Sequence, residues 1–235
     1  MSEPVEIIED LTPLNIADQV FDKIQKAIVE GDIATGSKIS EPALAREYGI
    51  SRGPLREALS RLEASNLIER KPNVGARVVT LSHQNLIEIY QIRESLEGLA
   101  ASLAAQNMAD EDIDVLENLL TEHEQQIRQD QTYFQKEGDM DFHYHIVKGS
   151  CNEHLIDMFC NDLYHLIRLY RYQFGMVSKR VGRAFHEHLQ IVDAIRQRDS
   201  ELARFLMSNH ISHSRKNVEQ MLETHLQSQS DTFTE

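Results

Sequence analysis

The stretch Leu44–Ile68, LAREYGISRGPLREALSRLEASNLI, decides the fold of the N-terminal part of the chain. Gly49 ends a short helical run, and Ser51 then stands where its hydroxyl can cap the backbone N–H groups of a second helix. The pattern predicts a helix–turn–helix. Arg52 and Arg56 share one face at the start of the second helix, a position from which guanidinium groups can pair with guanines in a DNA major groove.

A further helix and a hairpin flank this motif. Apolar residues recur at helical spacing from Ile16 to Ile28, and Gly31 can close that helix in the left-handed conformation. After the motif, residues 67–70 and 76–80 are short extended runs separated by turn residues, which predicts a β-hairpin. The sequence therefore predicts a winged helix–turn–helix over residues 15–80, after a disordered N-terminus formed by residues 1–14.

The charge of the chain is unevenly distributed. The formal net charge is -14, which argues against a general affinity for DNA. Residues 36–79, however, carry eight basic and five acidic side chains, a net charge of +3, whereas residues 81–235 carry 14 basic and 25 acidic ones, a net charge of -11. The acidity therefore belongs to the C-terminal part and leaves site-specific binding by the N-terminal part open.

The C-terminal part is predicted to be an all-helical bundle over residues 81–226, with helices that include about residues 132–149 and 153–175, followed by a flexible tail, residues 227–235. The fold class is therefore mainly α, because few strand-like alternations occur. No apolar run approaches the roughly 18 residues of a membrane span, and the acidic start lacks the pattern of a signal peptide. We expect a cytoplasmic protein that does not enter a membrane. Cys151 and Cys160 fit no disulfide or zinc framework.

Four polar residues stand on apolar helical stripes of the C-terminal part: Asp139, His143, His188 and His210. A buried carboxylate is costly unless it is paired or bound to a metal, and one carboxylate with three imidazoles suits a divalent transition metal. Spacing alone leaves two alternatives open. Any of the histidines can be a hydrogen-bonded core residue, and His213 competes with His210 for an inward-facing position.

The run from Ile16 to Thr80 is similar to the DNA-binding domain of the GntR family of bacterial transcription regulators. It departs from the family pattern at Thr35, where Pro is usual, and at Asn66, where Gly usually ends the recognition helix. Asn tolerates the left-handed conformation that Gly would supply. The matching residues are Ile28, Gly31, Gly36, Leu44, Ala45, Ser51, Arg52, Pro54, Leu55, Arg56, Glu57, Ala58, Leu59, Arg61, Leu62, Glu63, Leu67, Ile68 and Gly75.

The C-terminal part resembles the helical effector-binding (FCD) domain of the FadR branch of that family. The signature residues are Arg93, Leu96, Glu97, Ala100, Ala101, Asp139, Phe142, His143, Asn152, Glu187, His188, Ile191, Asp199 and His210. Metal-binding members of this branch carry Asp and three His at matching positions. The resemblance therefore implies that Asp139, His143, His188 and His210 bind Zn²⁺ or Ni²⁺, with Mn²⁺ as a third candidate.

The resemblance also assigns roles to other residues. Arg52 and Arg56 would contact bases. The phosphates would be faced by Ser51 at the helix N-terminus and by Arg46 and Arg77. Gly75 would let the wing approach the minor groove. Arg93 lies on an apolar face and needs a buried partner. That partner is either Glu97, four residues on, or the carboxylate of a small organic acid bound over the metal. The other candidates for the effector cavity are Asn161 and His165.

These expectations combine into a homodimeric, ligand-responsive transcription regulator rather than an enzyme. Two winged heads would bind a pseudo-palindromic operator in double-stranded DNA, and a small organic acid bound at the metal would control that binding, most simply as relief of repression. Three alternatives stay open: a metal sensor in which the ion is the signal, a metal that only holds the fold together, and a metal-dependent enzyme. The sequence shows no dedicated nucleophile or acid–base pair for the last.

Overall fold

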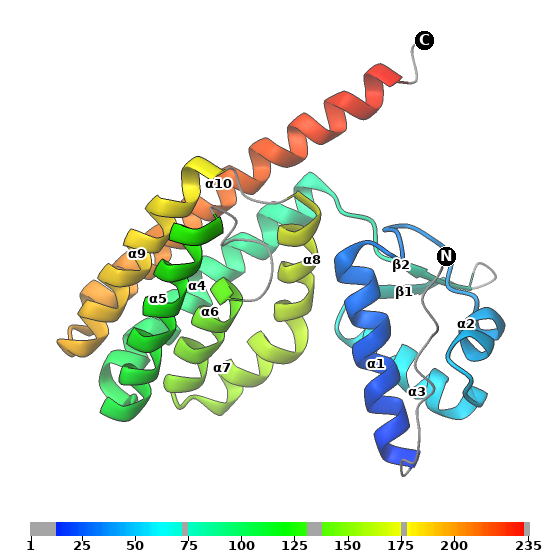
Figure 1. The fold of residues 1–235 in the computed structure, drawn as a ribbon, viewed down its shortest axis with the longest axis horizontal. Helices are drawn as coiled ribbons and strands as arrows, with labels where there is room; N and C mark the ends of the chain where they lie inside the picture. Colours follow the sequence, from blue (N-terminus) through cyan, green and yellow to red (C-terminus); the bar gives the residue numbers. More distant parts are fainter. Residues whose placement is uncertain (1–12, 72–74, 131–137, 175–177, 233–235) are drawn as a thin grey trace. The chain divides into compact units, whose positions relative to one another are not determined.

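The computed structural model describes residues 13–71, 75–130, 138–174 and 178–232, and its fold is mainly helical with one small sheet, as the sequence predicts (Figure 1). The chain forms two compact units. Unit 1 contains the described residues up to Thr80 together with Asn161–Leu169, and unit 2 contains Leu81–Cys160 and the described residues from Tyr170 onward. No helix in the described ranges is long and apolar enough to cross a membrane.

Unit 1 contains three helices and a two-stranded antiparallel sheet: α1 Pro13–Glu30, α2 Glu41–Glu47, α3 Arg52–Ala64, β1 Ile68–Lys71 and β2 Gly75–Val78. Helix α3 packs against α1, α2 and β1. Val20, Ile24 and Ile28 of α1 are buried, as are Leu55 and Leu59 of α3, because both helices turn their apolar stripes inward. In the sheet, Ile68 pairs with Val78 and Lys71 with Gly75. This arrangement is the winged helix–turn–helix that the sequence predicts.

Two details of this unit concern predicted helix ends. Asn66, just after α3, has a φ of 57°, so it adopts the left-handed conformation that its position requires. Ser51 is the N-cap residue of α3, but its hydroxyl makes no capping hydrogen bond to the described backbone, contrary to the sequence prediction. Ser51 is exposed, so water can satisfy the first N–H groups of α3 and the hydroxyl is not needed there.

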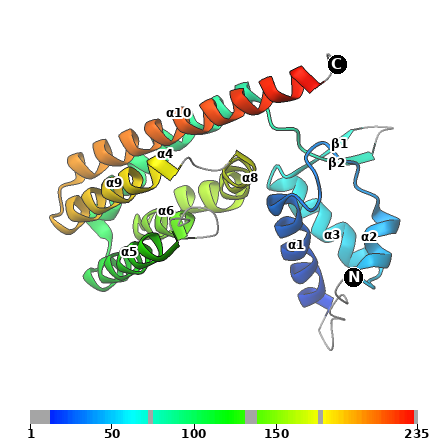
Figure 2. The same ribbon diagram turned by 45° about the horizontal axis from the view of Figure 1, so that its top comes forward.

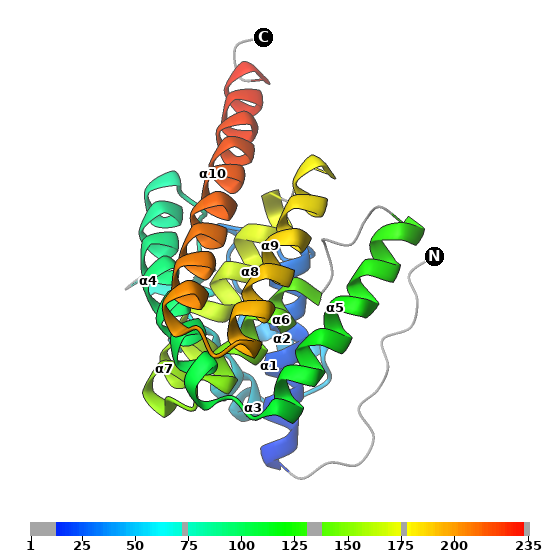
Figure 3. The ribbon, with the colours of Figure 1, turned by 90° about the vertical axis from the view of Figure 1, so that its left-hand side faces the viewer.

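Unit 2 is a helical bundle. Its helices are α4 His83–Asn107, α5 Asp110–Asp130, α6 Gly138–Gly149, α7 Glu153–Asp157, α9 Ser178–Arg196 and α10 Ser200–Thr232. The π-helix Met158–Leu163 and α8 Tyr164–Phe174 follow α7 and are divided between the units, because Asn161–Leu169 group with unit 1. Helix α4 lies along α10 and also contacts α6 and α9, and α5 packs on α6 and α9 (Figures 2 and 3). Ser82 caps α4 by accepting a hydrogen bond from the N–H of Asn85.

Two contacts fix the long helices of the bundle. Gly98 brings α4 close to α10, since a Cβ at this position would overlap the hydroxyl of Ser208. The hydroxyl of Tyr170 on α8 donates to the carbonyl of Ser82 at 3.1 Å and accepts from the N–H of Ser82 and from Asn85, each at 3.2 Å. The start of α4 is therefore held by a side chain that lies far away in the sequence.

The bundle differs from the sequence prediction in two segments. One continuous helix was expected over about residues 153–175, whereas the π-helix interrupts it. A flexible tail was expected from residue 227, whereas α10 continues to Thr232; residues 227–232 contain no Gly or Pro that would end a helix. The expected helix over about residues 132–149 is described from Gly138 onward, and residues 131–137 lie outside the described residues. Residues 1–12 of the predicted disordered segment 1–14 also lie outside them, while its last two residues, Pro13 and Leu14, belong to α1.

Candidate metal centre and nucleic-acid interface

The face of α3 opposite its core side carries the two predicted base-reading arginines. Arg52 and Arg56 are both exposed at the N-terminal end of the helix, while Leu55 and Leu59 are buried on its other side. The Nε of Arg56 donates to Oε2 of Glu41 at 3.2 Å. An ion pair exposed to this degree contributes about 0–1 kcal/mol, so a guanine can replace Glu41 as the partner of Arg56 at little cost.

The residues predicted to contact the DNA backbone lie around this face. Arg46 is exposed on α2, with its Nε donating to the carbonyl of Pro42. Arg77 is half-buried on β2 and donates from Nη1 to the carbonyl of Gly36 at 2.9 Å, so it also ties the wing to the loop before α2. Gly75 begins β2 exposed, with a φ of 90° that a side chain would disfavour.

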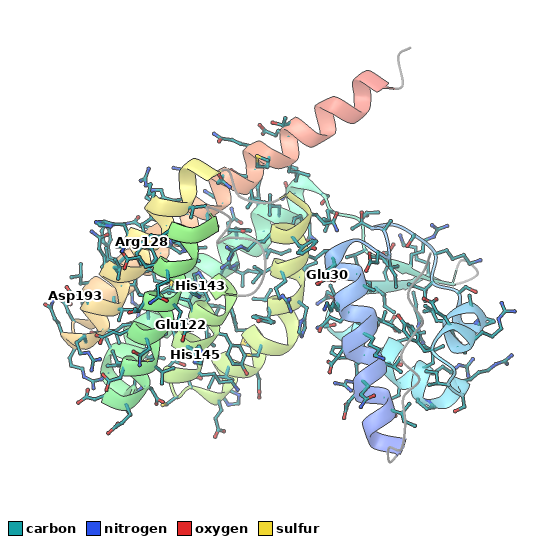
Figure 4. All side chains as sticks on the ribbon, viewed as in Figure 1. Glu30, Glu122, Arg128, His143, His145 and Asp193 are labelled. Atoms are coloured by element: carbon teal, nitrogen blue, oxygen red, sulfur yellow. The ribbon has the colours of Figure 1, made fainter. Side chains whose placement is uncertain are left out.

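Three buried imidazoles from three helices meet inside unit 2. His143 comes from α6, His188 from α9 and His210 from α10, and their exposed fractions are 1%, 0% and 2%. One nitrogen of each ring lies within 4.8 Å of the other two, and the Nε2 atoms of His188 and His210 are 3.2 Å apart. Figure 4 labels His143 inside the bundle, and His145, two residues on, is exposed. The sequence therefore places the histidines of α6 on opposite sides of that helix.

Two carboxylates hold the outer nitrogens of this cluster. Nδ1 of His143 lies 2.5 Å from Oε2 of Glu97 on α4, and Nδ1 of His210 lies 2.8 Å from Oε2 of Glu187 on α9. A carboxylate favours the proton on the nitrogen that it faces, which leaves the lone pair of the ring on Nε2. Both rings are therefore oriented as metal-ligating histidines usually are.

Arg93 pairs with the same buried carboxylate. Its Nε donates to Oε1 of Glu97 at 2.6 Å, and its guanidinium lies 4.7 Å from the centre of the Tyr90 ring. Burial raises the pKa of Glu97, but the charges of Arg93 and His143 and their hydrogen bonds outweigh burial and lower the pKa from 4.5 to about 2. Glu97 is thus a carboxylate that links a buried cation to a histidine of the cluster.

The donor set fits a transition metal. A tetrahedral ion with metal–nitrogen distances of about 2.0–2.1 Å requires two ligand nitrogens about 3.3 Å apart. The 3.2 Å between Nε2 of His188 and Nε2 of His210 agrees with that separation. Phe142 stacks on His188, with ring centres 4.0 Å apart, and keeps that side of the cluster apolar. Three such imidazoles can hold Zn²⁺ or Ni²⁺.

The remaining predicted site residues have different places. Asp139 lies on α6 one turn before His143, but its side chain is outside the described residues, as is that of Asn161 in the π-helix. His165, on α8, lies in unit 1, where its Nδ1 is 2.5 Å from Nε2 of Gln25. Burial lowers the pKa of His165 to about 4, with the charge of Arg168 acting in the same direction.

His213 lies beside the cluster rather than in it. Its side chain is 35% exposed, and its Nδ1 is 2.9 Å from Oε1 of Glu187. From the sequence, Glu97 was expected only as a partner of Arg93, and no contact was expected for Glu187. The position of Glu97 on an inward face was a usable signal, whereas Glu187 lies about 100° around α9 from His188, so periodicity pointed it away from the cluster.

Comparison with known proteins assigns a family to the N-terminal and to the C-terminal part of the chain. Residues 16–78 match the family described as bacterial regulatory proteins, gntR family, and residues 88–213 match the family described as FCD domain. The uncharacterized HTH-type transcriptional regulator YdhC of Bacillus subtilis (strain 168) is 30% identical over 210 residues, which are 87% of this chain and 92% of that protein.

A second relative, the probable D-xylose utilization operon transcriptional repressor of Paenarthrobacter nicotinovorans, is also 30% identical and covers 86% of this chain and 88% of its own. Among solved structures, E. coli McbR/YncC superposes with a TM-score of 0.74 over 88% of this chain and 98% of that one, at 22% identity. This last similarity concerns the fold alone.

Proposed function

The chain belongs to the GntR family of bacterial transcription regulators and carries an FCD domain, and from that premise we propose that it is a homodimeric repressor controlled by a small organic acid. Members of this family are DNA-binding transcription regulators and not enzymes, which removes the metal-dependent enzyme from the candidates. The Paenarthrobacter relative is named a repressor, which supports repression here. Because bacterial DNA lies in the cytoplasm, the protein would act there.

The exposed pair Arg52 and Arg56 carries the DNA-binding half of the proposal. Both stand at the N-terminal end of α3, which in a helix–turn–helix is the end that meets base edges. A bidentate arginine–guanine pair contributes about 1–3 kcal/mol of discrimination between bases. Ser51, Arg46, Arg77 and Gly75 would position the head on the phosphates and in the minor groove. Two copies of the chain would each occupy one half-site of a pseudo-palindromic operator.

An operator can be obtained by selecting duplexes from a random library with the wild-type protein, and its affinity measured by fluorescence anisotropy. We expect Arg56→Ala to lose specific binding by at least tenfold, with an unchanged circular dichroism spectrum. Arg128→Ala removes the same charge and an ion pair of the same kind from exposed α5, and should leave affinity within twofold. Unchanged affinity in Arg56→Ala would refute the assignment of α3 as the recognition helix.

The buried imidazoles carry the metal half. We propose that His143, His188 and His210, together with Asp139 one turn before His143, hold a divalent transition metal, Zn²⁺ or Ni²⁺ before Mn²⁺. The metal would supply a Lewis-acidic cation for the carboxylate of the effector. Glu97 and Glu187 keep two imidazoles oriented, and Arg93 beside Glu97 offers a second positive charge to an acid. Asn161 and His165 group with unit 1, so they are not part of this proposed effector site.

Metal content separates ligands from bystanders. We expect the wild-type protein, loaded with Ni²⁺ and desalted, to retain one ion per chain, and His143→Ala to retain less than a tenth of that. The metal content is measured by inductively coupled plasma mass spectrometry. His145→Ala, two residues away on the exposed side of α6, is the matched control and should retain the full amount. Equal retention in both variants would remove the site from His143.

A metal-sensor role is the second candidate, favoured by three protein imidazoles that could hold the ion without an effector. Operator affinity measured against free Ni²⁺, with and without a panel of small organic acids, distinguishes the two. A response to the metal alone supports the sensor, and a response that requires both supports the effector. Loss of the circular dichroism spectrum on chelation would instead indicate a metal that only maintains the fold.

A further inference from the structure

A groove separates α9 from α10 on the outside of the His cluster. It encloses about 280 Å³, and its described lining includes Arg183 and Glu187 of α9 and Asn209 and His213 of α10. His210 also lines it, so one side of a predicted metal ligand is reached from this groove.

The lining offers more hydrogen-bond donors than acceptors. A guanidinium, three imidazoles and two side-chain amides face a single carboxylate, Glu187. That carboxylate is already surrounded, because Oε1 is 3.2 Å from Nε of Arg183 and 2.9 Å from Nδ1 of His213, while Oε2 is 2.8 Å from Nδ1 of His210. The negative charge inside the groove is therefore matched, and the remaining donors favour a ligand rich in oxygen acceptors.

Arg183 is the group best placed to recognise such a ligand. Its side chain is 64% exposed, and among the residues that the structure describes Nη2 makes only a long contact of 3.4 Å with Nε2 of His213. Its bond to Glu187 is an exposed i, i+4 pair, which is weak and is easily exchanged for another carboxylate. A guanidinium binds a carboxylate through two parallel hydrogen bonds, which makes it more selective for that group than an imidazole or an amide.

We propose that the groove between α9 and α10 binds a small organic carboxylate through Arg183, and that Glu187 transmits its presence to His210. When Arg183 turns to the ligand, Glu187 loses one donor and accepts more strongly from Nδ1–H of His210. A more basic imidazole is a better metal ligand, so the acid and the metal favour each other's binding. By linkage the effect is reciprocal. The coupling rests on the proposed metal site, whereas binding in the groove does not.

The first arm of the test uses the full chain freed of metal by chelation and dialysis. Succinate serves as the probe, and its binding is measured by isothermal titration calorimetry. We expect wild type to bind succinate and Arg183→Gln to bind it at least tenfold more weakly. Arg128→Gln breaks an i, i+4 pair on α5 whose arginine is also exposed, outside the groove, and should bind succinate as wild type does.

The second arm measures Ni²⁺ affinity by competition with a chromogenic chelator, with and without succinate. We expect succinate to tighten Ni²⁺ binding several-fold in wild type and to have no effect in Arg183→Gln. Glu187→Gln should bind Ni²⁺ more weakly but lose the dependence on succinate. This loss of coupling is a result that a merely structural role of Glu187 would not produce.

The outcomes separate the two proposals. Succinate binding that is absent from wild type, or is unchanged in Arg183→Gln, overturns the groove site even if an acid binds elsewhere in the unit. Succinate binding with Ni²⁺ affinity that does not respond overturns the role of Glu187. If wild type fails to bind Ni²⁺, the metal site falls and the coupling with it, while the metal-free titration still decides whether the groove is a carboxylate site.

Discussion

Glu97 is the residue on which the buried charges of unit 2 depend. It is wholly buried and accepts from both Arg93 and His143, so it neutralises a guanidinium and orients an imidazole at once. Removing one member of a buried ion pair leaves the other charge uncompensated, which costs about 3–5 kcal/mol. The two roles of Glu97 can be measured separately. Its charge next to Arg93 makes the stability of the fold depend on pH, whereas its orientation of His143 affects the affinity for a metal.

The pH dependence of stability should report Glu97. Its pKa in the folded protein, about 2, lies below the unfolded value, so its contribution is present above about pH 4.3 and is lost as pH falls toward 2. We expect the free energy of unfolding of metal-free wild type, from urea titrations, to fall over this range by on the order of 3 kcal/mol more than that of Glu97→Gln. The exposed Glu88→Gln variant should follow wild type, and parallel curves for Glu97→Gln and wild type would contradict the assignment.

Individual residues also show where sequence reasoning succeeded and where it could not. The apolar residues from Ile16 to Ile28 were placed on one helical face by their spacing, and Ile24 and Ile28 are buried, because helical periodicity fixes which side of a helix faces inward. The contact between Glu187 and His210 joins two helices whose relative rotation is set by packing of the whole bundle, so no local pattern reports it. The predicted capping hydrogen bond of Ser51 is absent from the described structure for a different reason: at an exposed helix end, water competes with the hydroxyl for the backbone N–H groups.

At the scale of elements, the close approach of α4 to α10 depends on Gly98. A methyl group there would overlap the hydroxyl of Ser208, which donates to the carbonyl of Glu94 at 3.0 Å. Helices that pack this closely tolerate added volume poorly, because both backbones must move apart. This glycine is needed for lack of space rather than for an unusual backbone angle.

We therefore expect Gly98→Ala to lower the free energy of unfolding by about 1–3 kcal/mol, despite the higher helix propensity of alanine. Gly182→Ala on α9 is the matched control, because nothing lies within 4 Å of the added Cβ. That variant should gain about 0.5–1 kcal/mol. Adding Ser208→Ala to Gly98→Ala should restore part of the loss in urea titrations, and additive losses would show that the strain lies elsewhere.

For the whole molecule, the division into two compact units predicts how it unfolds. Only unit 2 contains the His cluster, so a metal that binds there stabilises that unit directly. Ligand at a hundredfold excess over its dissociation constant adds about 2.7 kcal/mol to the stability of the state that binds it. The winged helix–turn–helix has its own apolar core, and metal binding in unit 2 does not directly raise its free energy of unfolding.

Differential scanning calorimetry should accordingly resolve two transitions, of which Ni²⁺ raises one by several degrees and leaves the other unchanged. In His210→Ala neither transition should respond to the metal. A single transition that shifts as a whole would show that the units unfold together. Two shifted transitions in wild type, or a shifted one in His210→Ala, would place a metal site elsewhere in the chain.

The π-helix Met158–Leu163 has a consequence for the history of the sequence. A π turn holds an extra residue compared with an α turn, and removing one residue would rotate α8 by about 100° relative to α7. Tyr170 would then turn away from Ser82, and the start of α4 would lose its three hydrogen bonds to that hydroxyl. A one-residue insertion is the simplest origin of such a turn. Alignments of relatives that lack it should therefore open a one-residue gap between positions 158 and 163, accompanied by a change at position 170.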